Sequence, residues 1–227
     1  MTSTGASTRP EVPYGAWPSP LGLDALTART VTLGEPRLDA TSTWWVERRP
    51  ENGGLATLVR CPDGGIPGDV NLVLPGGDTL DARTRVYEYG GGAYDVADGT
   101  VVACHGPASR LYRAEVDEDA APSAGAADVP AGLRYPPEPG PLTASARPLT
   151  PAGGARYAAP LIDHRRGLVH AVREDHDNPD AAGQPTVDLV AVPLDGSGAD
   201  DGSAVRTVLA GWDFVASPAL SPDGRLL

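Results

Sequence analysis

Residues 93–106 read AYDVADGTVVACHG, a stretch in which two short runs of strand-forming residues surround an Asp-Gly pair. Valine, tyrosine and threonine favour strands, and an Asp-Gly pair between two such runs is a strong signal for a tight turn. The stretch therefore predicts a β-hairpin that turns at Asp98 and Gly99.

The same strand–turn–strand unit recurs along the chain, with new units starting near Pro36, Ala93, Pro160 and Pro218. The starts lie roughly 55–70 residues apart, and four short strands per unit at this spacing are the signature of propeller blades. The sequence therefore predicts an all-β fold, a partial β-propeller of about three four-stranded blades plus the start of another. The strands are expected in segments 42–49, 55–61, 69–77, 93–106, 109–117, 157–175, 187–196, 204–211 and 217–227.

Three segments do not follow the strand–turn–strand repeat. Residues 1–20 are rich in serine, threonine and proline and are expected to form a flexible N-terminal arm, followed by the incomplete propeller over 21–227. Within the propeller, residues 22–30 are compatible with a short helix. Residues 117–143 are rich in alanine, proline, glycine and acid, and bury too little apolar surface to offset the entropy of ordering. They are expected to form a disordered insert between blades.

Charge and hydropathy exclude two classes of partner. The formal net charge is −12, which repels a phosphate backbone and argues against nucleic acid. No apolar run reaches the ~18 residues that a membrane-spanning helix needs, so no membrane partner is expected. The first fifteen residues are polar and lack the apolar stretch of a secretory signal. A cytoplasmic location is therefore expected.

A run of three glycines, Gly90, Gly91 and Gly92, follows a Tyr-Glu-Tyr sequence. A nucleotide-binding glycine loop needs a helix after it, and here a strand-like segment follows, so phosphate binding is excluded by context. The glycines are expected to form a structural bend between blades, where the backbone turns sharply or approaches a neighbour. Tyr87 and Tyr89 alternate with Glu88, so the two tyrosines are expected to share one face and Glu88 to point to the other. If the tyrosine face is the core, Glu88 points outward or into a central channel.

No catalytic or metal-binding motif emerges from the sequence. A G-x-S-x-G nucleophile motif is absent, and so is the strand–helix alternation that builds a hydrolase sheet, so no catalytic residue is expected in this chain. His170, Glu174 and His176 would share one face of an extended strand and could hold zinc. A strand end that runs into an acidic loop is the favoured interpretation, with no metal and no cofactor.

Several motifs resemble the N-terminal β-propeller of the prolyl oligopeptidase family of serine peptidases, in its bacterial dipeptidyl-aminopeptidase and acylaminoacyl-peptidase-like branch. The most specific pair is RTRVYEYGGGAY over 83–94, followed at a blade's distance by AVREDH over 171–176. SPDGR over 221–225 is less specific, because TolB-like propellers of many functions contain it. The remaining segments that carry the resemblance are YGAWPSPL, WWVERRPENGG, SRLYR, LVAVPLDG and FVASPALSPDGR.

The resemblance implies a function that needs a second domain. In this family the propeller precedes an α/β-hydrolase domain with the catalytic serine, restricts access to the active site and selects short peptides. That domain is absent from this sequence, which is expected to be truncated before it. Glu88 and Glu174 are the candidates for carboxylates that line the substrate channel. The alternatives are a non-catalytic TolB-like module that binds proteins and a truncated gene product without function.

Overall fold

The structure, a computed structural model, describes residues 13–16, 22, 30–117 and 141–227. The chain divides into two units, residues 1–30 and 31–227, and every element named below lies in the second unit. The expected helix over 22–30, most of the expected arm and most of the expected insert lie outside the described residues. Among the helices of the described part, none is long and apolar enough to cross a membrane.

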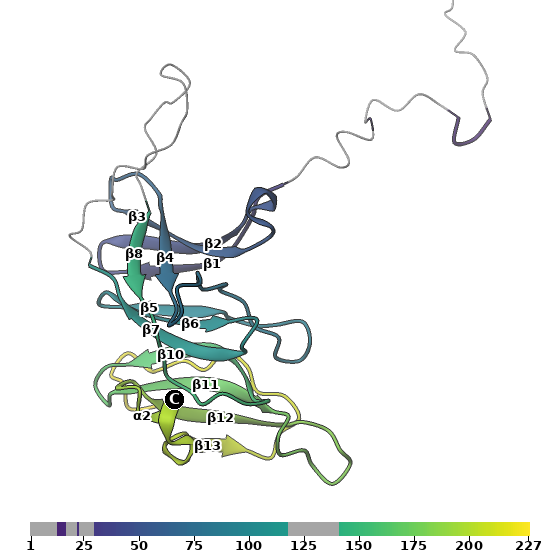
Figure 1. The fold of residues 1–227 in the computed structure, drawn as a ribbon. Coiled ribbons are helices and arrows are strands. Elements are labelled where there is room, and N and C mark those ends of the chain that lie inside the picture. Colours follow the sequence, from purple (N-terminus) through teal and green to yellow (C-terminus); the bar gives the residue numbers. More distant parts are fainter. Residues whose placement is uncertain (1–12, 17–21, 23–29, 118–140) are drawn as a thin grey trace, which may run out of the picture. The chain divides into compact units, whose positions relative to one another are not determined.

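The second unit contains three mainly antiparallel sheets (Figure 1). The first sheet has the order β1 (Thr32–Asp39), β2 (Ser42–Arg48), β3 (Ala56–Pro62), β4 (Gly68–Val73) and β8 (Leu142–Ser145). The second has the order β5 (Tyr94–Ala97), β6 (Thr100–His105), β7 (Arg110–Glu115) and β9 (Arg147–Pro148). The third has the order β10 (Arg156–Asp163), β11 (Leu168–Asp175), β12 (Thr186–Pro193) and β13 (Arg206–Ala210). The helical elements are η1 (Pro50–Asn52), α2 (Ser197–Asp200) and η2 (Gly202–Ala204). The prediction of an all-β partial propeller of about three blades is confirmed.

The first sheet has five strands instead of the expected four, because the chain crosses between two sheets. Strand β8 pairs in parallel with β4, and the Ala146 N–H then donates to the Val73 carbonyl at 2.7 Å. Only one residue separates β8 from β9, which pairs antiparallel with β7 in the second sheet. Strand β8 begins at Leu142, inside the segment expected to be an insert. A four-residue strand with few strand formers gives no pattern to detect in the sequence.

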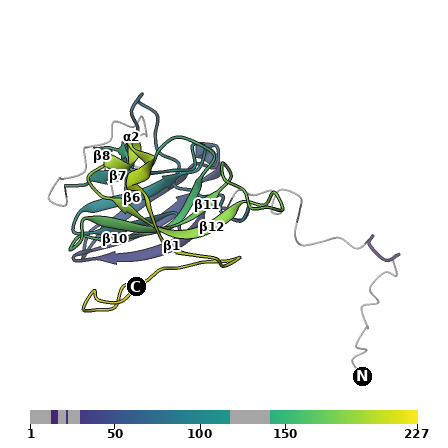
Figure 2. The ribbon, with the colours of Figure 1, turned by 90° about the horizontal axis from the view of Figure 1, so that it is seen from below.

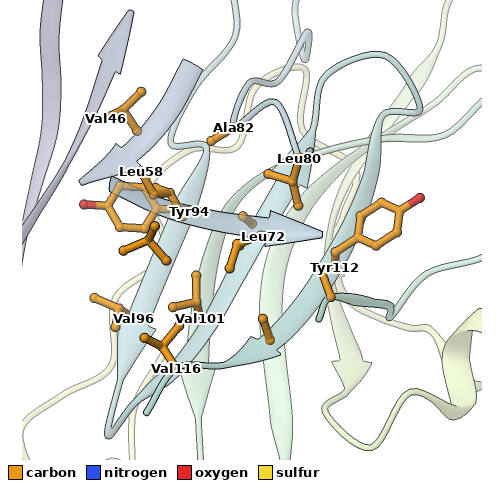
Figure 3. Packing of buried hydrophobic residues seen from close by; sticks show 14 of the residues in the cluster. Val46, Leu58, Leu72, Leu80, Ala82, Tyr94, Val96, Val101, Tyr112 and Val116 are labelled. Atoms are coloured by element: carbon orange, nitrogen blue, oxygen red, sulfur yellow. The ribbon is translucent and has the colours of Figure 1, made fainter. Parts of the chain in front are cut away.

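A continuous apolar core joins the first two sheets. Trp44, Val46 and Leu58 from the first sheet pack against Tyr94 and Val101 from the second, and all are buried. Figure 3 shows the side chains of this cluster converging from the two sheets. Because each sheet covers the face of its neighbour, the sheets stabilise one another as blades do.

The second and third sheets share another core. Val102, Cys104 and Leu111 of the second sheet contact a cluster that includes Val169 and Val190 of the third. Strand β6 therefore buries both of its faces, one against each neighbouring sheet, as its unbroken apolar run VVAC over 101–104 requires. Burial also raises the pKa of the Cys104 thiol to about 12.

A left-handed residue before proline marks the start of three of the four repeats. Glu35, Ala159 and Ser217 have φ angles of 56°, 48° and 49°, and each precedes a proline. In β1 and β10 the strand register shifts at the same place. Such a conformation costs about 1–3 kcal/mol and persists only where its surroundings hold it. Its recurrence shows that the repeat inferred from the sequence is a repeat of backbone geometry.

The fourth repeat reproduces this start but forms no regular strand. After Pro218, the Ser221 N–H donates to the Leu226 carbonyl at 2.9 Å, and the Gly224 N–H donates to the Ser221 carbonyl at 2.7 Å. Ser221 and Leu226 thus correspond to Asp163 and Leu168 at the turn of the third sheet. Figure 2 shows this C-terminal segment, in yellow, running separately from the three sheets. The expectation of strands over 217–227 is wrong in detail, because no described strand pairs with this segment to make a ladder.

Three carboxylates of one repeat accept hydrogen bonds from backbone N–H groups of the next repeat. Asp39 accepts hydrogen bonds from the N–H groups of Asp98 and Gly99, at 3.0 and 3.3 Å, and Asp95 accepts one from Ile162 at 2.9 Å. Glu35 accepts one from Ala93 at 2.6 Å. Each bond joins one repeat to the next, so these acids hold neighbouring blades in register.

Glu35 should make the chain less stable as the pH rises, whereas most acidic residues have the opposite effect. Burial raises its pKa above the ordinary value of 4.5, although the Ala93 N–H and two arginines lower it in part. The folded state therefore favours the protonated acid. This contribution is fully present below pH 4.5 and is lost as the pH rises through the raised pKa.

Glu35→Gln keeps an acceptor for the Ala93 N–H and removes the titration. We expect the stability of the parent chain relative to this variant to fall as the pH rises from 4.5 through the raised pKa of Glu35, measured by urea unfolding at a series of pH values. A parent chain that gains stability over the variant in that range would contradict the assignment.

Candidate functional site

The Tyr-Glu-Tyr sequence before the glycines forms a turn, and not the extended segment that the sequence suggested. Residues 86–89 lie in a turn between β4 and β5, and Tyr87 and Glu88 both have left-handed φ angles, 57° and 66°. The Glu88 N–H donates to the Arg85 carbonyl and the Gly90 N–H to the Val86 carbonyl, both at 2.9 Å. The predicted alternation is therefore wrong. Tyr89 is exposed, and Val86 is the residue that enters the core.

The three glycines occupy different environments in this bend. Gly90 has a φ of 90°, and a Cβ there would lie 2.9 Å from the Thr84 carbonyl oxygen. Gly91 and Gly92 pass close to β10, where added Cβ atoms would lie 3.3 Å from atoms of Ala158 and Ala159. Glycine thus allows the left-handed backbone at the first position and the close approach of two blades at the other two.

Gly90→Ala should destabilise the chain by about 2–3 kcal/mol, because an L-residue is strained at this φ and its Cβ meets backbone. Gly211 is a matched control, since its φ is also 90° and a Cβ added there would have no neighbouring atom within 4 Å. Gly211→Ala should cost about 1–2 kcal/mol. Urea unfolding of both variants measures the difference, and equal losses would show that the contact with Thr84 is unimportant.

Glu88 and Glu174, the two candidate channel carboxylates, are brought together by an arginine. Arg156 Nη1 lies 2.5 Å from a Glu88 carboxylate oxygen and 3.5 Å from a Glu174 oxygen. Arg85 also pairs with Glu88 at 3.2 Å. These hydrogen bonds, with that of Arg156 the strongest, lower the pKa of Glu88. The Glu88 side chain is 65% exposed and that of Glu174 only 9%, so Glu88 faces solvent and Glu174 supports Arg156 from below.

The histidines do not join Glu174 in a three-ligand site. His170 and Glu174 are four residues apart on β11, a separation of about 13 Å along an extended strand. His170 lies 3.7 Å from Asp163, and His176 lies 3.1 Å from Glu174. No group of three or more His, Cys, Asp or Glu side chains arranged to hold a metal ion occurs in the described part of the chain.

Residues just before the fourth repeat contact the segment 83–92, called the glycine loop below. The Tyr87 hydroxyl donates to the Val215 carbonyl at 2.8 Å and accepts from the Val215 N–H at 2.9 Å. The Phe214 ring packs on Tyr87 with 5.1 Å between centroids, and the Tyr89 ring centroid lies 5.8 Å from that of Tyr87. The loop is therefore held by hydrogen bonds, ring contacts and ion pairs at once.

Sequence reasoning missed Arg156 and Phe214 as members of this site. Arg156 is 68 residues from Glu88, and Val215, the neighbour of Phe214, is 128 residues from Tyr87. No local motif surrounds Arg156, and the motif FVASPALSPDGR that begins at Phe214 indicates a repeat and no functional site. The one available signal was their position in the repeat, because Arg156 and Phe214 stand at the same distance before the left-handed residues that start the third and fourth repeats.

The comparisons with known proteins match this chain to solved structures of peptidases. No protein-family profile matches the sequence, and no curated protein matches it. A crystal structure of puromycin hydrolase is 34% identical over 94% of this chain, with a TM-score of 0.67. A puromycin-hydrolysing peptidase of Mycobacterium tuberculosis is 33% identical over 95% of this chain, with a TM-score of 0.64. This chain spans 30% of the length of each of these structures.

The fold and the sequence identity therefore point to the same relatives over nearly the whole chain. Three stacked sheets and the start of a fourth repeat are what a partial propeller requires, and the same chain superposes on two peptidases at one third identity. The resemblance that the sequence motifs predicted is confirmed, and this chain is a partial β-propeller related to the puromycin-hydrolysing peptidases of the prolyl oligopeptidase family.

Proposed function

We propose that this chain is the N-terminal propeller portion of a serine peptidase that hydrolyses short peptides and related amides. The observation that carries the proposal is the 34% identity to puromycin hydrolase over 94% of the chain, together with coverage of 30% of that enzyme. An α/β-hydrolase domain is the proposed partner. It would supply the serine nucleophile and hydrolyse substrates through an acyl-enzyme.

The propeller portion would restrict access and select substrates by size. Support comes from the glycine loop, where several constraints hold a strained backbone. Two consecutive non-glycine residues, Tyr87 and Glu88, are left-handed. Strain of this kind is retained where the surroundings over-determine it, and it concentrates at functional sites. A rigid loop excludes large substrates better than a mobile one.

The two candidate carboxylates would have different roles in such a channel. Glu88 is exposed and lies on the loop, so it is the carboxylate available to meet a substrate. Glu174 is buried against Arg156, and it would position that arginine and, through it, Glu88. The proposal therefore assigns substrate contact to Glu88 and a positioning role to Glu174.

A chimera tests the proposed function. The segment of the Mycobacterium tuberculosis puromycin-hydrolysing peptidase that matches this chain would be replaced by residues 1–227, leaving the rest of that enzyme unchanged. We expect the chimera to hydrolyse puromycin and dipeptide amides, and to lose activity steeply as peptides lengthen. Deleting the segment instead should abolish the dependence on length.

A folded chimera that cleaves long and short peptides at equal rates would contradict the gating role. A folded chimera that binds substrate analogues and has no hydrolytic activity would contradict the pairing of this propeller with a hydrolase domain. Circular dichroism and size-exclusion chromatography establish that the chimera is folded before either comparison.

A further inference from the structure

We propose that the glycine loop acts as a strap that ties the second and third sheets to residues 212–227, and that the Tyr87 hydroxyl is the positioning group of this strap. The inference rests on the proposed function and deepens it, because it makes the width of the substrate entrance depend on the position of the glycine loop. Tyr87 would then act on specificity without touching the substrate.

The glycine loop is anchored at both of its ends, each on a different sheet. At its first residue, the Arg83 N–H donates to the Cys104 carbonyl of β6 at 3.2 Å. At its last residue, the Gly92 carbonyl accepts from the Ala159 N–H of β10 at 2.6 Å. The ends therefore bridge the second and third sheets, and the turn between them carries Tyr87 to residues 212–227.

Tyr87 does for Val215 what a residue of a paired strand would do. Residues 212–227, all of which the structure describes, contain no strand. Both backbone groups of Val215 are nevertheless bonded, because the Tyr87 hydroxyl donates to its carbonyl at 2.8 Å and accepts from its N–H at 2.9 Å. In an antiparallel ladder, a residue exchanges the same two bonds with the residue opposite. One hydroxyl thus fixes the backbone that leads into the fourth repeat.

The same contact closes a small apolar cluster between the segments. Val86 of the glycine loop is buried with Ala158 and Val172 of the third sheet, and Val215 packs against all three as part of this cluster. Burial raises the pKa of Tyr87, so its hydroxyl keeps the proton that it donates. Moving Val215 away from the hydroxyl would also uncover the cluster. The glycine loop and residues 212–227 should therefore loosen together.

The strained backbone of the turn makes its position sensitive to this contact. Tyr87 and Glu88 are consecutive left-handed residues, a conformation that persists only where the surroundings hold it. The bond from the Tyr87 hydroxyl to Val215 is one restraint, and the bond from Arg156 Nη1 to the Arg85 carbonyl, at 3.1 Å, is another. Without the hydroxyl, the turn can relax toward the extended conformation that its sequence favours, which would change the shape of the entrance.

Hydrogen exchange of backbone amides in the 227-residue chain tests the strap, with Tyr87→Phe as the variant. This variant keeps the ring and removes both hydrogen bonds to Val215. Exchange should become roughly fivefold faster or more at Gly90 in the glycine loop and at Gly224 in the fourth repeat, the effect expected when a region loses its hydrogen bonds to a neighbour. The amides of β12, in the middle of the third sheet, should exchange as in the parent chain.

Two comparison variants separate coupling from local loosening. Arg165 Nη1 donates to the Asp223 carbonyl at 2.6 Å, so Arg165→Ala should speed exchange at Gly224 and leave Gly90 unchanged. Tyr89→Phe removes an exposed hydroxyl from the glycine loop itself and should change neither amide.

Two results of the exchange experiment would overturn the inference. Faster exchange in Tyr87→Phe that is confined to the Val215 amide would show that the two hydrogen bonds have only a local effect. Exchange that becomes equally fast in β12 would show that Tyr87 contributes to the general stability of the chain and does not position the glycine loop.

The effect on specificity is measured in the chimera with the Mycobacterium tuberculosis peptidase. Tyr87→Phe should raise severalfold the ratio of the cleavage rate for longer peptides to that for dipeptide amides, whereas Tyr89→Phe should leave this ratio as it is. An unchanged ratio for Tyr87→Phe in an active chimera would overturn the positioning role. An inactive chimera would contradict the proposed function alone, because the exchange experiment on the 227-residue chain needs no hydrolase domain and still decides whether the strap exists.

Discussion

Trp44→Ala is expected to lower the free energy of unfolding by about 3–5 kcal/mol, the cost of removing a fully buried large aromatic side chain. Trp44 is completely buried in the core between the first two sheets, beside Val46 and Leu58. The Arg60 guanidinium lies over its ring at 6.0 Å. The cavity left by alanine would separate two blades, and the sheets around it cannot close it without shifting against each other.

The adjacent Trp45 provides a matched control for this prediction. It points to the other face of β2, is half-buried, and donates from Nε1 to Glu47 at 2.7 Å. Trp45→Ala should cost about 1–2 kcal/mol, because less apolar surface is uncovered. Urea unfolding followed by circular dichroism compares the two variants. Equal losses would show that the core between the sheets does not depend on Trp44.

Asp81→Ala is expected to cost about 3–4 kcal/mol, since it leaves a buried backbone donor without an acceptor and removes a charged partner. Asp81 is buried, and its Oδ1 accepts from the Ala56 N–H at 3.0 Å. Its Oδ2 accepts from Arg83 Nε at 2.8 Å, and its own N–H donates to His105 Nδ1 at 3.0 Å. The residue therefore links β3, the glycine-loop segment and β6.

Asp81→Asn separates the two contributions. The amide oxygen can still accept from the Ala56 N–H, whereas the amide nitrogen cannot accept from Arg83, so the charge and both hydrogen bonds with Arg83 are lost. Because the Arg83 side chain is 47% exposed, that ion pair contributes about 1 kcal/mol or less. The asparagine variant should therefore unfold close to the parent chain in urea. An asparagine variant as unstable as the alanine variant would mean that the ion pair, and not the bond to Ala56, holds this junction.

The sequence predicted the strands and the repeat because both are encoded locally. Alternating or continuous apolar runs between glycine-rich turns identify a strand regardless of its partners, as in VVAC over 101–104. Three of the four repeat starts could be found in the same way, because a proline marks them at Pro36, Pro160 and Pro218. The resemblance to peptidase propellers rested on such local motifs as well.

The tertiary structure alone decided three features. Strand β8 joins the first sheet because the outer edge of β4 was free, which no pattern within residues 142–145 could indicate. The Tyr-Glu-Tyr segment turns left-handed because Tyr87 is bonded to Val215, a residue 128 positions away, although its own pattern suggested a strand. Glu88 and Glu174 are both paired with Arg156, a contact between segments that are far apart in the sequence. Local sequence sets which conformations a segment prefers, whereas contacts between distant segments select among them once the chain has folded.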